Sequence, residues 1–164
     1  MSGKDKQNFP SQAPRDLQAL LAQMGRDCVA FTLRKSARAI TQVYDEHMRK
    51  CGLKVNQFSL MASICYGQPI KVGDLAAGVG MDRTTVTRNL GPLQRDGLVD
   101  VSPGEDKRER LVSLTPSGEE RLRQAYPHWL AAQARLVEAL GRENWNGLKN
   151  GLGTLRRASK SLAD

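Results

Sequence analysis

Basic and hydroxyl side chains are concentrated in residues 83–95, and no acidic residue interrupts them. An arginine guanidinium in this stretch can bridge the two acceptors on the edge of a guanine base. Threonine hydroxyls can reach bases or phosphates, and threonine methyls can touch thymine. These residue types therefore suit a surface that reads the major groove of double-stranded DNA. The residues expected to supply the contacts are Arg83, Thr84, Thr85, Thr87, Arg88 and Arg95.

The residues that would position this surface have the spacing of a helix-turn-helix. Ala76 is small where two helices would cross, and Gly80, four positions later, can take a positive φ in the turn. Asp82 can cap the second helix at its positively charged end. Val86, Leu90 and Leu93 are expected to face inward. At about 100° per residue, the outward face would then hold Thr84, Arg88, Gly91 and Arg95.

A charged hairpin is expected directly after this helix. Val99 and Val101 predict one arm, residues 111–114 predict the other, and charged residues fill the tip between them. Such a tip next to a reading helix is typical of a wing that lies along the DNA backbone or in the minor groove. Asp106 can orient Arg108 through a local ion pair. The wing residues expected to contact DNA are Lys107, Arg108 and Arg110.

The composition agrees with a basic protein of one compact domain. The 164 residues include 25 Lys and Arg against 17 Asp and Glu, a formal charge of +8, which favours polyanionic partners. No apolar run approaches the roughly 18 residues of a membrane span. The polar first sixteen residues do not resemble a signal peptide, so a flexible N-terminal arm over 1–16 and a cytoplasmic location are expected.

Helical periodicity surrounds the central motif and predicts about six helices with one short hairpin. Pro92 should kink the reading helix, and Pro127 should bend or interrupt a helix that begins at Thr115. The last helix carries an apolar stripe with the spacing of a helix that packs on another helix. That stripe includes Trp145, Leu148, Leu152 and Leu155 and continues to Leu162.

Neither a metal site nor an enzyme is expected. Three cysteines form neither a disulfide framework nor a C-x-x-C knuckle, so reduced thiols are predicted. Cys65 is expected in the core and Cys51 at a helix end. His47 and His128 have no motif partner, and no phosphate loop or nucleophile elbow is present, so no cofactor is predicted.

The chain resembles the MarR family of bacterial transcriptional regulators from about Leu17 to Leu162. The matching segments are Thr87-Arg88-Asn89-Leu90, Arg95-Asp96-Gly97-Leu98-Val99, Asp106-Lys107-Arg108-Glu109-Arg110 and residues 111–118. The resemblance implies that Asp106 braces Arg108 and that Arg108 enters the minor groove. It implies a mainly α homodimer with a winged helix-turn-helix at 55–115 and dimerisation helices at 17–54 and 116–164. It also implies release from the operator by a small effector, often aromatic or anionic in this family.

The expected function is a repressor that binds a pseudo-palindromic operator through two recognition helices about one helical turn apart. One alternative is a redox-sensing regulator, because in some family members a cysteine at a position close to that of Cys28 becomes oxidised. Cys28 lies about two residues earlier than that position, which rotates a helical side chain by roughly 200°. Arg26 favours a reactive thiolate there, and Asp27 opposes it. The other alternative is a non-specific architectural DNA-binding protein.

Overall fold

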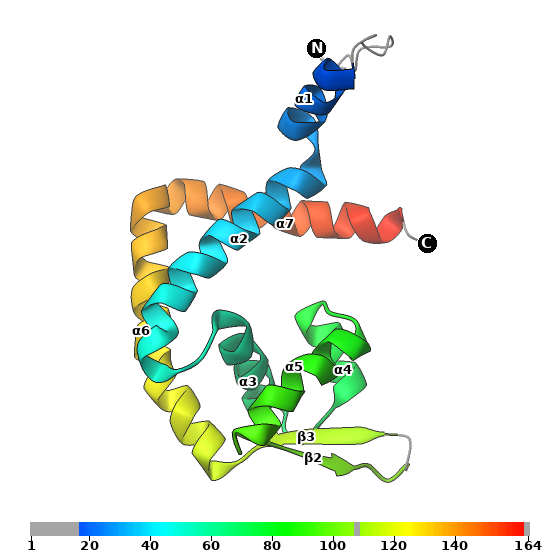
Figure 1. The fold of residues 1–164 in the computed structure, drawn as a ribbon, viewed down its shortest axis with the longest axis vertical. Coiled ribbons are helices and arrows are strands. Elements are labelled where there is room, and N and C mark those ends of the chain that lie inside the picture. Colours follow the sequence, from blue (N-terminus) through cyan, green and yellow to red (C-terminus); the bar gives the residue numbers. More distant parts are fainter. Residues whose placement is uncertain (1–16, 107–108, 163–164) are drawn as a thin grey trace. The chain divides into compact units, whose positions relative to one another are not determined.

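The computed structural model describes residues 17–106 and 109–162. The chain divides into two compact units, residues 1–41 and 42–164, and each is described by itself. In the first unit, helix α1 (Leu17–Asp27) precedes the first part of helix α2 (Val29–Met48) (Figure 1). Leu17, Leu21 and Met24 are each more than half exposed on α1. The expected arm over 1–16 lies outside the described residues.

The second unit begins with the end of α2 and contains the helix-turn-helix, the hairpin and two long helices (Figure 1). In chain order its elements are η1 (Arg49–Cys51), α3 (Val55–Gly67), β1 (Ile70–Lys71), α4 (Val72–Val79), α5 (Arg83–Arg95), β2 (Val99–Pro103), β3 (Arg110–Leu114), α6 (Pro116–Leu140) and α7 (Arg142–Ser161). The prediction of a mainly α fold with a winged helix-turn-helix is confirmed. The described residues hold seven α-helices and three strands, where about six helices and one hairpin were expected.

The additional strand, β1, makes the hairpin part of a three-stranded antiparallel sheet with the order β1-β3-β2. Val101 and Ile70 both pair with Val112, from opposite sides of β3. The ladder between β2 and β3 runs from Val99↔Leu114 out to Pro103↔Arg110. This pairing ties the middle of β3 to the segment that leads into α4.

The hydrophobic core joins the helix-turn-helix to α3, α6 and the sheet. Burial of these apolar side chains is the main term that stabilises the arrangement. The largest side chains with almost no exposed surface are Met48, Leu60, Met61, Ile64, Leu75, Val86, Leu93, Val99 and Val112.

Hydrogen bonds join the start of α6 to the backbone segment that follows α5. Thr115 caps α6 by accepting a hydrogen bond from Gly118 N (3.0 Å). The same residue donates from its hydroxyl to the Gly97 carbonyl (2.6 Å) and from its backbone N–H to the Leu98 carbonyl (3.1 Å). Gly118 is buried against Leu98, so closely that no side chain fits between the two backbones.

Two proline predictions and one cysteine prediction can be compared with this fold. Both α5 and α6 continue through their internal prolines, Pro92 and Pro127, so neither helix is interrupted, and the expected kinks at these residues stay predictions. The prediction of a core position for Cys65 is wrong, because this side chain is exposed near the end of α3. Met61 and Ile64 are buried, but Cys65, Tyr66 and Gly67 are all exposed, so the core does not extend to the last turn of α3.

Candidate nucleic-acid interface

The orientation of α5 follows from three inward apolar residues. Val86 and Leu93 have no exposed surface and Leu90 is 3% exposed, as the spacing predicts. Gly80 makes the turn from α4 with φ 68°, and Met81 N donates to the Ala76 carbonyl (3.0 Å). The turn and the core therefore fix which face of α5 points outward.

Asp82 caps the start of α5 and is bonded to Thr85 by two hydrogen bonds. Thr85 N donates to Asp82 Oδ1 (2.8 Å), and the Thr85 hydroxyl donates to Oδ2 (2.6 Å). Both bonds hold the pKa of Asp82 below its ordinary value, and the bond from the Thr85 hydroxyl contributes most. Because its hydroxyl proton is already donated within the cap, Thr85 can offer DNA only its methyl group and an oxygen acceptor.

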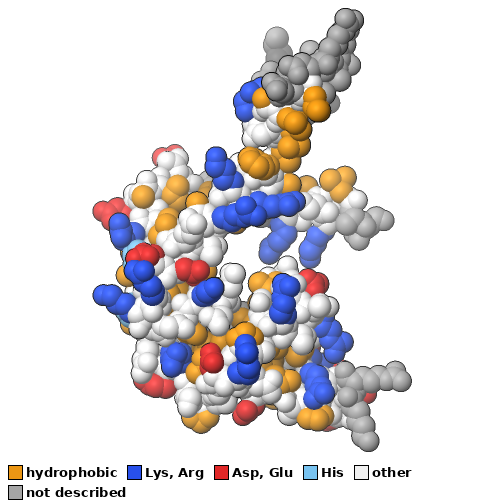
Figure 2. Space-filling view, in the orientation of Figure 1, with side chains coloured by type: hydrophobic (Ala, Val, Ile, Leu, Met, Phe, Trp, Pro, Cys, Tyr) orange, Lys and Arg blue, Asp and Glu red, His pale blue; other side chains and the backbone are white. Residues whose placement is uncertain are grey.

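The outward face of α5 carries cations that have no partner within the described chain. Thr84, Arg88 and Arg95 are exposed, and none of their side chains makes a hydrogen bond or ion pair with a described residue. The space-filling view shows Lys and Arg surface around α5 and the hairpin (Figure 2). An acid-free face with free guanidinium groups is suited to phosphates and guanine edges.

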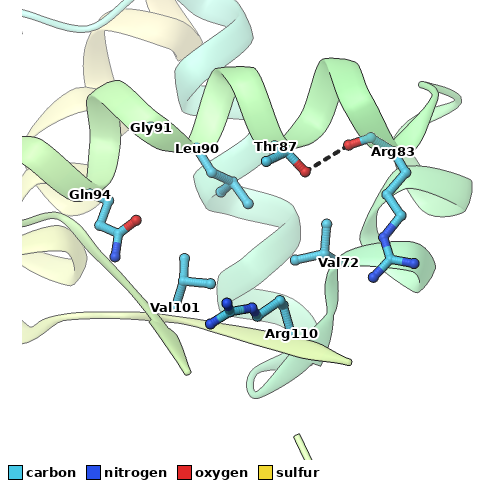
Figure 3. A pocket seen from close by; sticks show the side chains of 8 residues that line it. All are labelled: Val72, Arg83, Thr87, Leu90, Gly91, Gln94, Val101 and Arg110. Atoms are coloured by element: carbon cyan, nitrogen blue, oxygen red, sulfur yellow. Dashed lines mark hydrogen bonds between the residues drawn. The ribbon is translucent and has the colours of Figure 1, made fainter. Parts of the chain in front are cut away.

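A hollow of about 410 Å³ lies between α5 and the hairpin (Figure 3). Arg83 and Gln94 lie at opposite ends of the α5 side, and Arg110 faces them from β3. The Thr87 hydroxyl donates to the Arg83 carbonyl (2.9 Å). The lining residues are Val72, Arg83, Thr87, Leu90, Gly91, Gln94, Val101 and Arg110.

The hollow thus brings three predicted residues together and adds one that the sequence reasoning missed. Arg83 and Thr87 from α5 meet Arg110 from the hairpin, although they are far apart in the chain. Gln94 was missed, and its amide matches the donor and acceptor pattern of adenine. Its position seven residues after Thr87 places both on one side of α5, which is the signal that could have found it.

The tip end of the hairpin is held by an ion pair from β1. Lys71 Nζ donates to Glu109 Oε1 (2.7 Å), and this bond and the Glu109 charge raise the pKa of Lys71. Gly104 N also donates to the Glu109 carbonyl (3.0 Å). Lys107 and Arg108 lie outside the described residues, so their contacts with DNA and the pairing of Arg108 with Asp106 stay predictions.

The stripe expected at a dimer contact is largely uncovered within one chain. No residue of α7 is buried, and Leu148 and Leu152 are 40% and 41% exposed. Trp145 and Leu155 are half-buried. Lys149 lies over the Trp145 ring, with 5.6 Å between Nζ and the ring centroid.

The three cysteines are free thiols. Cys28 is partly buried between α1 and α2, and its sulfur accepts a hydrogen bond from Phe31 N (3.4 Å). Among the described residues, no group of three or more His, Cys, Asp or Glu side chains could hold a metal ion. Within the same residues, no helix is long and apolar enough to cross a membrane.

Comparison with solved structures finds a close likeness to a DNA complex. The M. tuberculosis transcriptional regulator MosR, in complex with DNA, matches with a TM-score of 0.75 at 36% identity. That match covers 82% of this chain and 98% of MosR.

Curated relatives include two transcriptional regulators. YwoH of Bacillus subtilis, an uncharacterized HTH-type transcriptional regulator, is 32% identical over 89 residues, which is 54% of this chain and 65% of YwoH. The transcriptional activatory protein BadR of Rhodopseudomonas palustris is 32% identical over 92 residues, 54% of this chain and 53% of BadR. The chain spans less than two thirds of the length of these two relatives.

The family model described as "MarR family" matches residues 52–109, which run from just after η1 into the hairpin. The expectation of a regulator in place of an enzyme is thereby confirmed. From the fold, the matched residues and the likeness to MosR, we conclude that the chain belongs to the MarR family of transcriptional regulators.

Proposed function

We propose that the chain is a sequence-specific regulator that binds a pseudo-palindromic DNA operator as a homodimer. The observation that carries this proposal is the outward face of α5, where Arg88 and Arg95 stand free of acidic partners. Arg83, Thr84, Thr87 and Gln94 would add contacts from α5, and Arg110 would reach the backbone from the hairpin. The DNA complex of MosR, at 36% identity, supports the same use of this fold.

The dimer is supported by apolar surface that one chain leaves exposed. On α7 the Leu148 and Leu152 side chains are about two fifths exposed, and on α1 Leu17 and Leu21 are more so. Apolar stripes of this kind on a folded protein mark association sites. A symmetric dimer would present two copies of α5 to successive major grooves, about one helical turn apart.

The test of sequence-specific binding starts with an operator selected from random DNA by the purified protein. We expect the selected fragment to bind more tightly than scrambled DNA, and both affinities to fall steeply with salt. Sedimentation of the free protein and of the complex should give two chains per molecule. Equal affinity for selected and scrambled DNA at every salt concentration would instead identify an architectural protein.

We further propose that the regulator is a repressor that an aromatic effector releases. The support is an aromatic cluster between α3, which precedes the helix-turn-helix, and the long helix α6. Trp129 stacks on Phe58 (5.9 Å between centroids) and on Tyr126 (5.8 Å), and Tyr126 is 53% exposed. An open aromatic edge of this kind favours a second ring in offset stacking.

The effector proposal is tested by titrating the protein–operator complex with benzoate while following Trp129 fluorescence. Release of DNA together with a change in Trp129 emission supports it, with a Trp145→Phe background used to isolate the signal. No release at saturating benzoate contradicts it. Transcription in vitro from a promoter that carries the selected operator then separates repression from the activation named for BadR.

A thiol switch at Cys28 is a second candidate, favoured by one contact. The Phe31 N–H donates to the Cys28 sulfur at the first turn of α2, which would stabilise a thiolate. If Cys28 is the switch, peroxide should weaken operator binding by the native chain and leave the Cys28→Ser variant unchanged. Equal loss of binding in both proteins would rule this candidate out.

A further inference from the structure

The excess of positive charge lies outside the part of the chain that is expected to read DNA. Residues 55–115, from the start of α3 to the N-cap of α6, hold seven Lys or Arg and seven Asp or Glu, so they add nothing to the formal charge of +8. Helix α7 holds five Lys or Arg and one acid, Glu143. Operator binding through α5 and the hairpin therefore does not account for the charge of α7.

Four of these cations form a basic stripe along one face of α7. Arg142, Lys149 and Arg156 are seven residues apart, and Lys160 follows four residues later, so all four point in nearly the same direction. From Arg142 to Lys160 the basic stripe is about 27 Å long. Glu143 is turned away from Arg142 by about 100°, which places it beside the basic stripe and outside it.

The side chains of the basic stripe are exposed and have no acidic partner. Arg142, Arg156 and Lys160 make no hydrogen bond or ion pair with any residue that the structure describes. Lys149 lies over the Trp145 ring, a contact that leaves its charge in place. The basic stripe therefore presents a row of cations that a bound polyanion would compensate.

The basic stripe is separate from the apolar stripe that the proposed dimer would cover. At about 100° per residue, the mean directions of the two stripes differ by roughly a quarter of a turn. A partner chain seated on the apolar stripe would thus leave the cations in solvent. The apolar stripe consists of Trp145, Leu148, Leu152 and Leu155.

The length and chemistry of the basic stripe match the phosphate backbone of double-stranded DNA. Duplex DNA carries one negative charge per about 1.7 Å of its axis, so 27 Å corresponds to roughly eight base pairs. Phosphate contacts need cations and no apolar surface. An anionic membrane fits less well, because a basic amphipathic helix enters a membrane through its apolar face, which the dimer would occupy.

We propose that the basic stripe of α7 binds the phosphate backbone of a second DNA segment while α5 occupies the operator. Lys and Arg that contact phosphates hold DNA without reading its bases, so the second segment would be bound regardless of its sequence. The regulator would then join two duplexes, one recognised through α5 and the other held through α7.

The test loads the full chain with a saturating, unlabelled operator fragment and then titrates it with a short fluorescent duplex of scrambled sequence. Fluorescence anisotropy should show that the loaded protein still binds the scrambled duplex, more weakly at higher salt. A triple variant, Arg142→Gln with Arg156→Gln and Lys160→Gln, should weaken this binding about tenfold or more and lower its salt slope by about 3. Operator affinity and the number of chains per molecule should stay unchanged.

Two further variants separate the basic stripe from overall charge. Arg142→Lys with Arg156→Lys should keep second-duplex binding, because point charges suffice for phosphates. The matched control is Lys50→Gln with Lys54→Gln and Arg123→Gln, which removes three exposed charges from outside α7 and should leave second-duplex binding nearly unchanged.

Four results would overturn the proposal. The first is operator-loaded protein that binds no scrambled duplex even at low salt. The second is an equal loss in the α7 triple variant and the matched control, which would reduce the effect to overall charge. The third is a loss of operator affinity in the α7 triple variant, which would assign the basic stripe to the operator. The fourth is tighter binding to phosphatidylglycerol vesicles than to the scrambled duplex at equal phosphate concentration, which would assign it to a membrane.

Discussion

Replacing Gly118 by alanine tests the close approach between α6 and the backbone that leaves α5. A Cβ at this position would lie 1.9 Å from the Leu98 carbonyl oxygen and 2.9 Å from its carbonyl carbon. Both atoms belong to the backbone, so no side chain can rotate away. The two segments would have to separate by about 1 Å, a form of overpacking that costs about 1–3 kcal/mol.

The separation would also strain the hydrogen bonds that Thr115 makes to Gly97 and Leu98, at about 1 kcal/mol for each bond lost. Against this, alanine is favoured over glycine inside a helix by about 1 kcal/mol. We therefore expect Gly118→Ala to lower the free energy of unfolding by about 2 kcal/mol. Without the steric clash, the same change would raise stability.

Urea denaturation followed by circular dichroism, at one fixed protein concentration, measures this difference. Gly78→Ala is the matched control, because Gly78 is exposed within α4 and an added Cβ there meets nothing within 4 Å. It should stabilise the chain by about 0.5–1 kcal/mol. If Gly118→Ala were as stable as Gly78→Ala, the close approach of Gly118 to the Leu98 backbone would be refuted.

Three further predictions concern α5. Leu93→Ala should destabilise the chain by roughly 2–5 kcal/mol in the same urea assay, because Leu93 is fully buried; a loss below about 1 kcal/mol would contradict its core position. Arg88→Ala should weaken operator binding and relax preference at one base, whereas Gln94→Ala should relax preference at another; unchanged selection from random DNA by either variant would refute its assignment. Since hydrogen bonds from Thr85 lower the pKa of Asp82, its charge stabilises the fold above the ordinary aspartate value, and this contribution disappears as pH falls through the lowered value. The melting temperature should therefore fall more on acidification for the native chain than for Asp82→Asn. Parallel curves of melting temperature against pH for the two proteins would contradict this.

Much of the helix-turn-helix could be predicted because its determinants are local. Ala76, Gly80 and Asp82 act within a few residues of their own positions, through a close helix crossing, a positive φ and a cap. The inward set around Val86 follows from helical periodicity alone. The same reasoning located the start of α6, where Thr115 and Pro116 form a cap.

What could not be predicted depends on interactions between distant segments. Strand β1 is two residues long and exists only because Ile70 and Lys71 pair with residues some forty positions later. Gln94 belongs to the hollow only once the hairpin folds back beside α5. Cys65 has apolar sequence neighbours, yet how far along α3 the core extends is decided by tertiary packing.

Because hydrogen bonds from Thr115 hold the start of α6 to Gly97 and Leu98, any change in the direction of α6 begins beside the reading helix. The helix has 25 residues and is therefore roughly 37 Å long. A rotation of a few degrees at Gly97 and Leu98 becomes a displacement of about 2–3 Å at Leu140, just before α7. In a dimer held through α7, the separation of the two reading helices would thus be set by the angle between α6 and the backbone at Gly97 and Leu98. That angle would therefore decide which half-site spacing the dimer fits, without any change in the residues that touch the bases.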